Sequence, residues 1–449
     1  MEYPGSKFTR PWRVTMMYLF IAAFFIISPL LVLYTSGYRY DFKNGIIQEI
    51  GAISIDVLPK NSNVFLNEIK IPDKMPIRLK NVSPGKYKIK ISADGFYDWE
   101  KEVTVENKQT IYIKEIKLIK KSTPEKIIDG QINQLSLSTD KNYLIYQKIN
   151  DKNQEFYLRD LNNNKDSLIF ADDKNKKYQM EWFENADLAA ISALDNTQIM
   201  VVEASAPKAS WDLTKEEKNK ITKWQWSNAY DGEIYYSTKN ELTIINALTK
   251  QKTVVGKNSF LDWLADNRQI WSIQHSTSTE QSIVIKNSFG SSQNFLILND
   301  SNNDGTQSSW YFVKTNGNQI LLKKSNQSEM LLVYQGAQYN FYGEKFLNSP
   351  YNNWWIMWTP WEITTYSQGE EPFLLNRSGE KLNKVVVLDE YNTLGLIWQD
   401  KMTVLFPYYF VNHTLINQPI NDAVADSQNR VLYFSGKIND QAGLWKINY

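Results

Sequence analysis

The sequence predicts an all-β protein that follows one N-terminal transmembrane helix. Three observations support this prediction. An uncharged apolar run occupies residues 14–34, segments of period-two alternation fill residues 51–120, and a turn followed by a strand recurs about every forty residues after Lys121. The chain has 449 residues, more than one small core requires, so at least two folding units are expected beyond the membrane segment.

The composition excludes several classes of protein. Lysine and arginine together number 50 and aspartate and glutamate 49, which gives a formal net charge of +1. Proteins that bind nucleic acid usually carry a clear basic excess, so no nucleic-acid partner is expected. The chain has no cysteine and therefore no disulfide, no thiolate metal site and no cysteine nucleophile.

The run from Val14 to Tyr34 predicts a transmembrane helix. As a helix it would be about 30 Å long, which matches the hydrocarbon core of a bilayer. A buried core helix is disfavoured because the run is apolar on every face. A cleaved signal peptide stays open as an alternative, since Thr35 and Gly37 are small residues at plausible cleavage spacing. Pro29 would bend the helix without preventing its insertion.

Positive charge on both sides of the run indicates its orientation. Lys7, Arg10 and Arg13 precede the run, whereas Arg39 and Lys43 follow it. This excess favours a cytoplasmic N-terminus, and the lack of a following cysteine excludes lipoprotein processing. The expected order is a cytoplasmic tail (1–13), a single-pass helix in the cell membrane (14–34), a linker (35–50), a β-sandwich (51–120) and a propeller (121–449), the last two outside the cytoplasm.

Residues 51–120 predict a small β-sandwich. Polar and apolar residues alternate in Ile53–Val57, Tyr87–Ile91 and Val103–Val105, as in strands with one buried face. Pro84-Gly85 and Asp94-Gly95 separate such segments as turn formers.

The order of turns and strands in this region follows a recurrent pattern. Its parts are a strand ending at Pro59, a hairpin with Val64-Phe65-Leu66-Asn67, a Pro76-x-x-Leu79 step, the run Pro84-Gly85-x-Tyr87-x-Ile89-x-Ile91, and Gly95-Phe96 with Trp99. This pattern resembles the PEGA domain family. The name-giving tetrapeptide is replaced by Pro59-Lys60-Asn61-Ser62, and the glycine expected after Asn67 is Glu68. The resemblance implies a cell-surface or envelope module without catalytic residues, which would act here as a spacer.

Residues 121–449 predict a β-propeller of about eight blades, with seven as the alternative. A repeat of about forty residues suits four-stranded blades rather than a helical repeat. The segment Pro124–Ile128 would be an outer strand that pairs with residues 443–447 and joins the two ends of the ring. The repeated turn and strand occur at Asp140–Tyr146, Asp231–Tyr236, Asp266–Trp271, Asn316–Leu322, Asp400–Phe406 and Gln428–Phe434, with fainter copies at Asp187-Leu188 and Asn353-Trp354.

A stack of separate sandwiches stays open as an alternative to the propeller. The repeat resembles the broad class of WD40-like and TolB-like envelope propellers, at the level of fold only, because no diagnostic dipeptide is present.

Side chains suited to catalysis are scarce. His275 and His413 are the only histidines, and both are expected in loops. The chain lacks a GxxxxGK[ST] phosphate loop and a GxSxG nucleophile elbow. The carboxylates are scattered along the chain, so no catalytic residue is predicted.

Asp300, Asn302 and Asp304 predict a low-affinity calcium turn. With Gly305 they match the first half of a calcium loop, in which oxygen ligands stand at alternate positions. The twelfth position is Tyr311 rather than glutamate, and strands are expected on both sides, so an EF-hand is not expected. A polar turn without Ca²⁺ is the alternative.

Trp354, Trp355, Trp358 and Trp361 crowd into one short stretch that contains Pro360. Exposed rings would stack on sugars or on the apolar residues of a partner, whereas buried rings would pack a blade. Adjacent residues face opposite sides of a strand, and proline interrupts a strand. At least one of the four rings is therefore expected to be available for binding.

These observations predict a non-enzymatic, membrane-anchored protein of the cell envelope. The propeller would be a binding or scaffolding platform, and its partner would be an envelope protein or a cell-surface glycan. The alternative is an extracytoplasmic hydrolase or lyase that acts on polysaccharide through carboxylates in the propeller channel.

Overall fold

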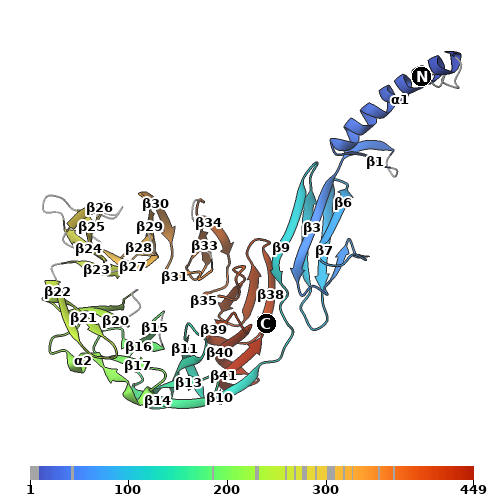
Figure 1. Ribbon diagram of the computed structural model, residues 1–449. Coiled ribbons are helices and arrows are strands. Elements are labelled where there is room, and N and C mark those ends of the chain that lie inside the picture. Colours follow the sequence, from blue (N-terminus) through green and yellow to red (C-terminus); the bar gives the residue numbers. More distant parts are fainter. Residues whose placement is uncertain are drawn as a thin grey trace, which may run out of the picture. The chain divides into compact units, whose positions relative to one another are not determined.

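The chain forms two compact units, Met1–Lys121 and Ser122–Tyr449. The computed structural model describes residues 10–41, 45–184, 187–227, 232–257, 260–266, 269–275, 281–288, 291–300, 309–316, 319–325, 327–351, 354–367 and 370–449. Strands dominate both units after one N-terminal helix (Figure 1), which confirms the predicted all-β class.

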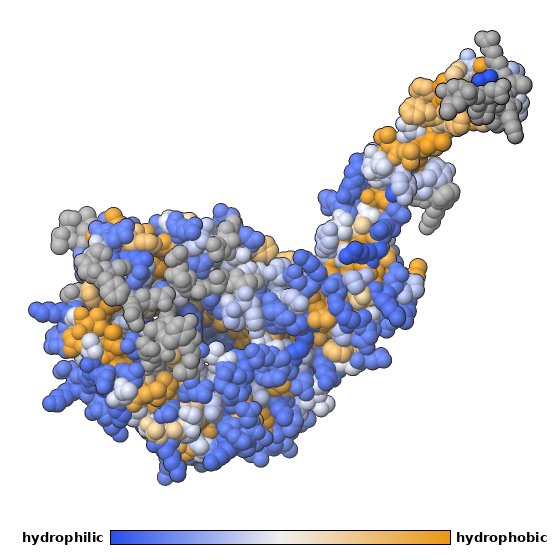
Figure 2. All heavy atoms as spheres, viewed as in Figure 1, coloured by the Kyte–Doolittle hydropathy of each residue, from blue (hydrophilic) through white to orange (hydrophobic). Residues whose placement is uncertain are grey.

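The helix α1 (Arg10–Thr35) begins the described part of the chain. It extends beyond the predicted 14–34 at its N-terminal end and runs through Pro29. Its apolar side chains are exposed along its surface (Figure 2). Among the described residues it is the one helix long and apolar enough to cross a bilayer.

A β-hairpin lies within residues 35–50, the region predicted as a linker. The hairpin consists of β1 (Tyr38–Asp41) and β2 (Ile46–Glu49), which pair antiparallel. At the end of α1 the Gly37 N–H donates to the Tyr34 carbonyl at 3.3 Å, and Gly37 has φ of 87°, a conformation that glycine adopts without strain. Four-residue strands are too short to show a period in the sequence.

Two sheets form the small sandwich of the first unit. Ile53, Ile55 and Val57 on one sheet and Ile89 and Ile91 on the other are all buried, which confirms the predicted alternation. The first sheet has the order β6 (Ile77–Val82), β3 (Gly51–Leu58) and β9 (Thr110–Lys117), with β3 and β9 parallel. The second has the order β5 (Ile69–Ile71), β4 (Asn63–Leu66), β7 (Gly85–Ser92) and β8 (Trp99–Val105).

The turn between β4 and β5 departs from the PEGA pattern. Its central residues, Asn67 and Glu68, have φ of 48° and 68°. Asn67 suits this conformation, and its Oδ1 accepts a hydrogen bond from the Lys88 N–H at 2.8 Å. Glu68 stands where the resemblance predicts glycine, and it holds a left-handed conformation that a long side chain disfavours.

Four-stranded sheets make up the second unit, which confirms the predicted β-propeller. Strands β10–β41 form eight such sheets in the described part of the unit, and the sheets follow one another around a common centre (Figure 1). In seven of them the strands come in chain order, from the inner strand outward. The eighth combines three strands from the end of the chain with one strand from the start of the unit.

The first four sheets contain short strands with short connections. The bounds are β11 (Gln131–Leu137), β12 (Tyr143–Ile149), β13 (Asn153–Asp160), β14 (Lys165–Asp173); β15 (Tyr178–Trp182), β16 (Leu188–Ala193), β17 (Ile199–Glu203), β18 (Trp211–Asp212); β19 (Lys223–Trp226), β20 (Glu233–Ser237), β21 (Glu241–Asn246), β22 (Lys252–Lys257); and β23 (Asp262–Asp266), β24 (Gln269–His275), β25 (Gln281–Ser288), β26 (Ser291–Asn299). Two single turns, η1 (Pro207–Ala209) and α2 (Leu213–Glu216), flank β18.

The last four sheets repeat this plan. Their bounds are β27 (Trp310–Asn316), β28 (Gln319–Lys324), β29 (Glu329–Tyr334), β30 (Ala337–Tyr342); β31 (Lys345–Asn348), β32 (Trp355–Trp358), β33 (Glu362–Tyr366), β34 (Phe373–Arg377); β35 (Leu382–Val387), β36 (Leu394–Trp398), β37 (Met402–Phe406), β38 (Val411–Ile416); and β39 (Ile420–Asp426), β40 (Val431–Ile438), β41 (Gln441–Asn448), β10 (Glu125–Asp129).

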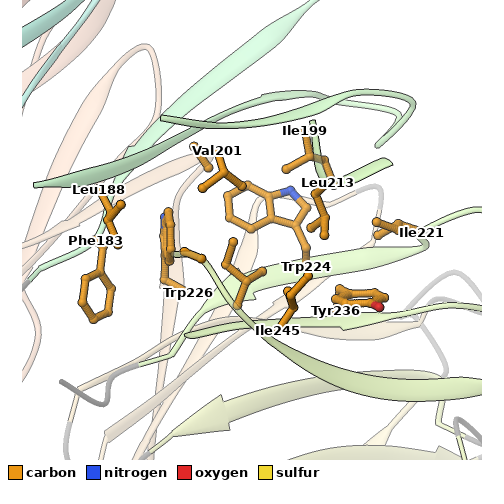
Figure 3. Packing of buried hydrophobic residues seen from close by; sticks show 13 residues of the cluster. Phe183, Leu188, Ile199, Val201, Leu213, Ile221, Trp224, Trp226, Tyr236 and Ile245 are labelled. Atoms are coloured by element: carbon orange, nitrogen blue, oxygen red, sulfur yellow. The ribbon is translucent and has the colours of Figure 1, made fainter. Parts of the chain in front are cut away.

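Hydrophobic clusters fill the spaces between neighbouring sheets. Figure 3 shows the cluster between the sheets of β15–β18 and β19–β22, where Trp224 and Trp226 meet Val201, Leu213 and Tyr236. The two tryptophan rings lie edge to face, with centroids 6.3 Å apart. Similar clusters join other neighbouring sheets, so much of the aromatic content packs the propeller.

Strand β10 pairs with β41 and joins the two ends of the second unit. Glu125 lies opposite Lys446 and Asp129 lies opposite Gly443, in the region the sequence predicts for this pairing. A Cβ on Gly443 would lie 2.6 Å from the Ile128 carbonyl oxygen, so glycine lets the β10 backbone approach closely.

At two positions in the propeller, an aspartate accepts hydrogen bonds from a lysine and from a backbone N–H and so links three successive inner strands. We call this the Lys–Asp–amide arrangement. Asp422 accepts from Lys384 Nζ at 2.5 Å and from the Leu135 N–H at 2.9 Å, which links β35, β39 and β11. The second set links β19, β23 and β27 in the same way: Asp262 accepts from Lys223 Nζ at 2.7 Å and from the Phe312 N–H at 2.7 Å.

Two sequence expectations require correction here. The repeat copy at Asp400–Phe406 falls on β37, the third strand of its sheet, whereas the copies on β12, β20, β24, β28 and β40 fall on second strands. The true counterpart, β36, follows Asn392-Thr393 and lacks the turn signature. The two histidines lie in strands rather than loops, His275 at the end of β24 and His413 in β38.

Candidate functional site

The structure divides the four tryptophans into two groups. Trp355 and Trp358 are buried on β32, and Trp355 Nε1 donates to Gln319 Oε1 inside the core. Trp361 is half exposed in the turn after β32, and Trp354 is half-buried just before that strand. The two buried rings offer no face to a ligand, so Trp355 and Trp358 belong to the packing.

Trp354 lines a groove between two neighbouring sheets of the propeller. The groove has a volume of about 320 Å³ and is lined by Trp354, Thr365, Ser367, Glu370, Glu371, Phe373, Leu375, Pro407, Tyr408 and Phe410; we call it the aromatic groove. The rings of Trp354 and Tyr408 lie 5.4 Å apart across the two sheets, and those of Phe373 and Phe410 lie 6.0 Å apart. Phe373, Tyr408 and Phe410 are each about half exposed.

The turn between β37 and β38 presents two of these rings. The Tyr409 N–H donates to the Phe406 carbonyl at 3.2 Å, which forms the turn. Phe410 then adopts φ of 54°, a conformation rare for a bulky residue. A left-handed backbone lowers the stability of the folded protein, and an exposed ring adds no packing to offset this loss. Strained conformations of this kind concentrate at binding sites.

Two carboxylates stand beside the rings of the aromatic groove. Glu370 and Glu371 are exposed and precede β34, whose first residue is Phe373. Within the described residues neither glutamate forms an ion pair, whereas nearby Arg377 pairs with Glu362 at 2.9 Å. The groove therefore combines aromatic faces with unneutralised negative charge.

Only part of the predicted calcium turn lies among the described residues. Asp300 is buried at the end of β26, and its Oδ2 accepts a hydrogen bond from the Ser282 hydroxyl at 2.8 Å. Asn302 and Asp304 lie outside the described residues. In the part of the chain that the structure describes, no three His, Asp or Glu side chains come together to hold a metal ion.

The inner strands also line a central channel. One part of this channel has a volume of about 590 Å³. It is lined by residues of β15, β19, β23 and β27, among them Glu181 and Lys314. The Glu181 side chain is exposed to the space of the channel, but the protein atoms around it reduce its hydration and raise the pKa of its carboxyl group, and the positive charge of Lys314 partly opposes this rise.

Most residues of the aromatic groove are not evident from the sequence. Trp354 alone is among the predicted binding residues. The run Phe406-Pro-Tyr-Tyr-Phe410, in which aromatic residues occupy a turn, is a signal that could have found Tyr408 and Phe410. Phe373 and the two glutamates come from a different sheet, so their place beside that turn depends on the tertiary fold.

Comparison with known proteins gives one family match and distant structural similarities. Residues 50–119 match the PEGA domain family. Among solved structures, the β-propeller domain of Myceliophteria thermophila Cps50 (Swd1) is similar with a TM-score of 0.44 and 7% identity, over 73% of this chain and 99% of that chain. The Dos1 propeller has a TM-score of 0.45 and 9% identity, over 74% of this chain and 95% of that chain. A comparison with curated proteins finds no match.

Sheet topology and the family match define the class of protein. It is a β-propeller protein with a PEGA domain at residues 50–119 and an N-terminal apolar helix. The similarities to solved propellers are too distant to indicate a partner.

Proposed function

We propose that this protein is a membrane-anchored interaction platform of the cell envelope. In this proposal α1 is the anchor, the PEGA domain is the spacer, and the propeller binds a partner outside the cytoplasm through the aromatic groove. The observation that carries the proposal is the group of half-exposed rings in this groove. Apolar side chains that cluster on the surface of a folded domain indicate a site where another molecule binds.

The chemistry of the groove favours a cationic side chain, with arginine as the best fit. Aromatic faces are electronegative and attract a guanidinium group, which is more weakly hydrated than an ammonium group. Glu370 and Glu371 supply acceptors and complementary charge. A volume of about 320 Å³ lies at the small end of ligand sites and suits one side chain better than an oligosaccharide. The partner is therefore a protein segment that presents a basic side chain.

Small probes test this chemistry on the detergent-solubilised full-length protein. In saturation-transfer NMR we expect N-acetylarginine amide to bind, and its binding to weaken as sodium chloride is added. We expect the citrulline analogue, which has similar shape but no charge, not to bind at the same concentration. Binding of methyl glucoside without binding of the arginine probe would replace the cationic partner by a glycan.

Variants localise the binding to the aromatic groove. Phe410→Ala and Glu371→Gln should each weaken the arginine probe about two- to fivefold, the scale of one exposed cation–π or charge contact. Tyr342→Ala is the matched control, because Tyr342 is an exposed ring on β30, outside the groove. Equal loss of binding in the control would show that the probe binds elsewhere.

A second candidate function rests on the channel. The raised pKa of Glu181 beside Lys314 is the kind of environment in which a carboxyl group acts as a general acid on a polysaccharide. Release of reducing sugar from cell-wall polysaccharide, abolished by Glu181→Gln and unaffected by Phe410→Ala, would favour the enzyme over the platform.

A further inference from the structure

We propose that the β1–β2 hairpin lies in the headgroup region of the bilayer that α1 crosses. It would form a second membrane contact on the outer side. This inference rests on the proposed anchoring by α1, and it is independent of the partner that the propeller binds. Three observations support it: the hairpin is fixed to the end of α1, its base is fixed to the sandwich, and its far part exposes apolar side chains.

Arg39 on β1 holds the hairpin against the end of α1. Its Nη1 donates to the carbonyls of Tyr34 and Tyr38, each at 2.7 Å, and its guanidinium lies 3.6 Å from the centre of the Tyr34 ring. A cation at the C-terminal end of a helix also complements the helix dipole. The hairpin therefore begins where the helix leaves the hydrocarbon core.

The base of the hairpin is fixed to the sandwich. Glu49 pairs with Lys108 at 2.7 Å, and Gln48 Nε2 donates to Ser83 Oγ at 3.0 Å. The Ile50 N–H donates back to the Gly37 carbonyl at 3.2 Å, which closes the connection below the hairpin. These contacts hold β1 and β2 at the end of the hairpin next to the sandwich, so the opposite end of the hairpin points away from the sandwich.

The end away from this base exposes apolar residues. Tyr40 lies opposite Ile47 in the pairing, and Ile46 follows opposite Asp41. Tyr40, Ile46 and Ile47 are each more than half exposed. Isoleucines at this position would face water in a soluble domain, but beside a membrane helix they can enter the interface together with tyrosine, which favours that zone.

The aromatic residues at both ends of α1 match this placement. Trp12 near the start and Tyr34 near the end are exposed and span about 33 Å along the helix axis, close to the thickness of the hydrocarbon core. Tyr34, Tyr38 and Tyr40 then extend the outer set of rings from the helix into the hairpin. Clusters of this kind occur where a protein meets lipid headgroups.

Single cysteine labels test the inference cleanly, because the chain has no cysteine of its own. Ile47→Cys, Ile26→Cys and Asp94→Cys are each labelled with the fluorophore NBD in the full-length protein and reconstituted into phosphatidylcholine–phosphatidylglycerol vesicles. Ile26 lies within α1 and Asp94 lies in the exposed turn after β7. Iodide in the water and nitroxide lipids in the bilayer quench the label according to its position.

We expect label 26 to be quenched only by nitroxide lipid and label 94 only by iodide. Label 47 should be quenched by a nitroxide near the headgroup, and its emission should at least double relative to label 94. Label 47 behaving like label 94 while label 26 stays protected would overturn the hairpin proposal and leave the anchor intact.

Two other outcomes also decide against the proposal. Protection of label 47 from both quenchers would mean that protein, such as a second copy of this chain, covers the hairpin. Iodide quenching at all three positions would remove the anchor itself. An unchanged melting temperature for each labelled protein shows that the label reports on the folded state.

Discussion

Two residues with long or bulky side chains, Glu68 and Phe410, adopt left-handed backbone conformations that such side chains disfavour. Glu68 takes such a conformation in the PEGA domain, where its side chain forms no hydrogen bond or ion pair with the described residues, and Phe410 takes one in the aromatic groove. The first is a local deviation from a family pattern and the second presents a ring to solvent. Their expected responses to substitution differ accordingly.

Glu68→Gly should stabilise the β4–β5 hairpin. Relief of the left-handed strain is worth about 1–2 kcal/mol, and the added flexibility of the unfolded chain offsets about 0.4–1 kcal/mol of it. We expect a net gain of about 1 kcal/mol, visible as roughly fivefold slower amide exchange in peptides covering residues 63–71.

The matched control for this change is Asn67→Gly. Asn67 tolerates positive φ, and glycine would remove the hydrogen bond from the Lys88 N–H to Asn67 Oδ1. Exchange should therefore become faster in this variant. Faster exchange in Glu68→Gly as well would contradict the strain assigned to Glu68.

Stability should depend on pH through Glu181. Its pKa is raised in the folded protein above the ordinary value of 4.5, so the folded state favours the protonated carboxyl group. The cost of its charge is absent below about pH 4.5 and fully present above the raised pKa. Glu181→Gln should melt above the wild type at pH 8, with the difference vanishing in acid. A lower melting temperature at pH 8 would mean that attraction to Lys314 outweighs burial.

At the scale of single residues, the sequence predicts that the tryptophans differ in exposure but not which of them is exposed. Trp354 and Trp355 differ in burial and pack against different clusters, Trp354 against the one that contains Leu382 and Trp355 within the one that contains Tyr366. The alternation of side chains along a strand cannot say which ring is exposed, because that depends on which face of β32 meets the neighbouring sheet.

Among the elements, strand β10 depends on a close backbone approach. Gly443→Ala would place a methyl group 2.6 Å from the Ile128 carbonyl oxygen and force β10 away from β41. The expected loss is about 1–3 kcal/mol of unfolding free energy. Thermal melting of the full-length protein measures it.

Gly256→Ala is the control, since nothing lies within 4 Å of the Cβ it would add on the edge strand β22. We expect a change within about 0.5 kcal/mol. Equal destabilisation by the two substitutions would mean that general strand effects, rather than the pairing of β10, explain the result.

The Lys–Asp–amide arrangement should stabilise the propeller at both of its positions. Asp422→Ala leaves Lys384 and the Leu135 N–H without their acceptor, and Asp262→Ala does the same to Lys223 and the Phe312 N–H. Each should cost about 1–3 kcal/mol.

Hydrogen exchange separates the two variants by location. Asp422→Ala should speed exchange in β11 and β39, which lie at opposite ends of the sequence of this unit, and Asp262→Ala should speed it in β23 and β27. Faster exchange confined to β39 in the first variant would show that Asp422 does not couple the two ends.

Elements with a strong period or a repeated turn are predictable from this sequence, and short ones are not. The alternation in β3 and β7 and the outer position of β10 follow from local pattern and spacing. The strands of the β1–β2 hairpin are too short to show a period in the sequence. The turn before β36 lacks the residues that mark the other copies of the repeat. Packing against neighbours decides their structure.

The whole molecule joins an apolar helix, a PEGA domain and a propeller in one chain. The order of these parts is readable from the sequence because each has its own composition and period. The aromatic groove is not, because residues from two sheets line it and only the fold brings them together. The proposed partner likewise follows from a surface rather than from a sequence motif.

Site-specific photocrosslinking in cells tests whether the aromatic groove binds a protein partner. A benzophenone amino acid replaces Tyr408 in the aromatic groove and, in a control, Tyr342 on β30, which is also an exposed tyrosine. We expect a discrete crosslinked protein partner from position 408 in the membrane fraction. Its yield should fall in Glu371→Gln, and it should be missing from position 342. The same adducts from both positions, or none from position 408, would contradict the proposed binding.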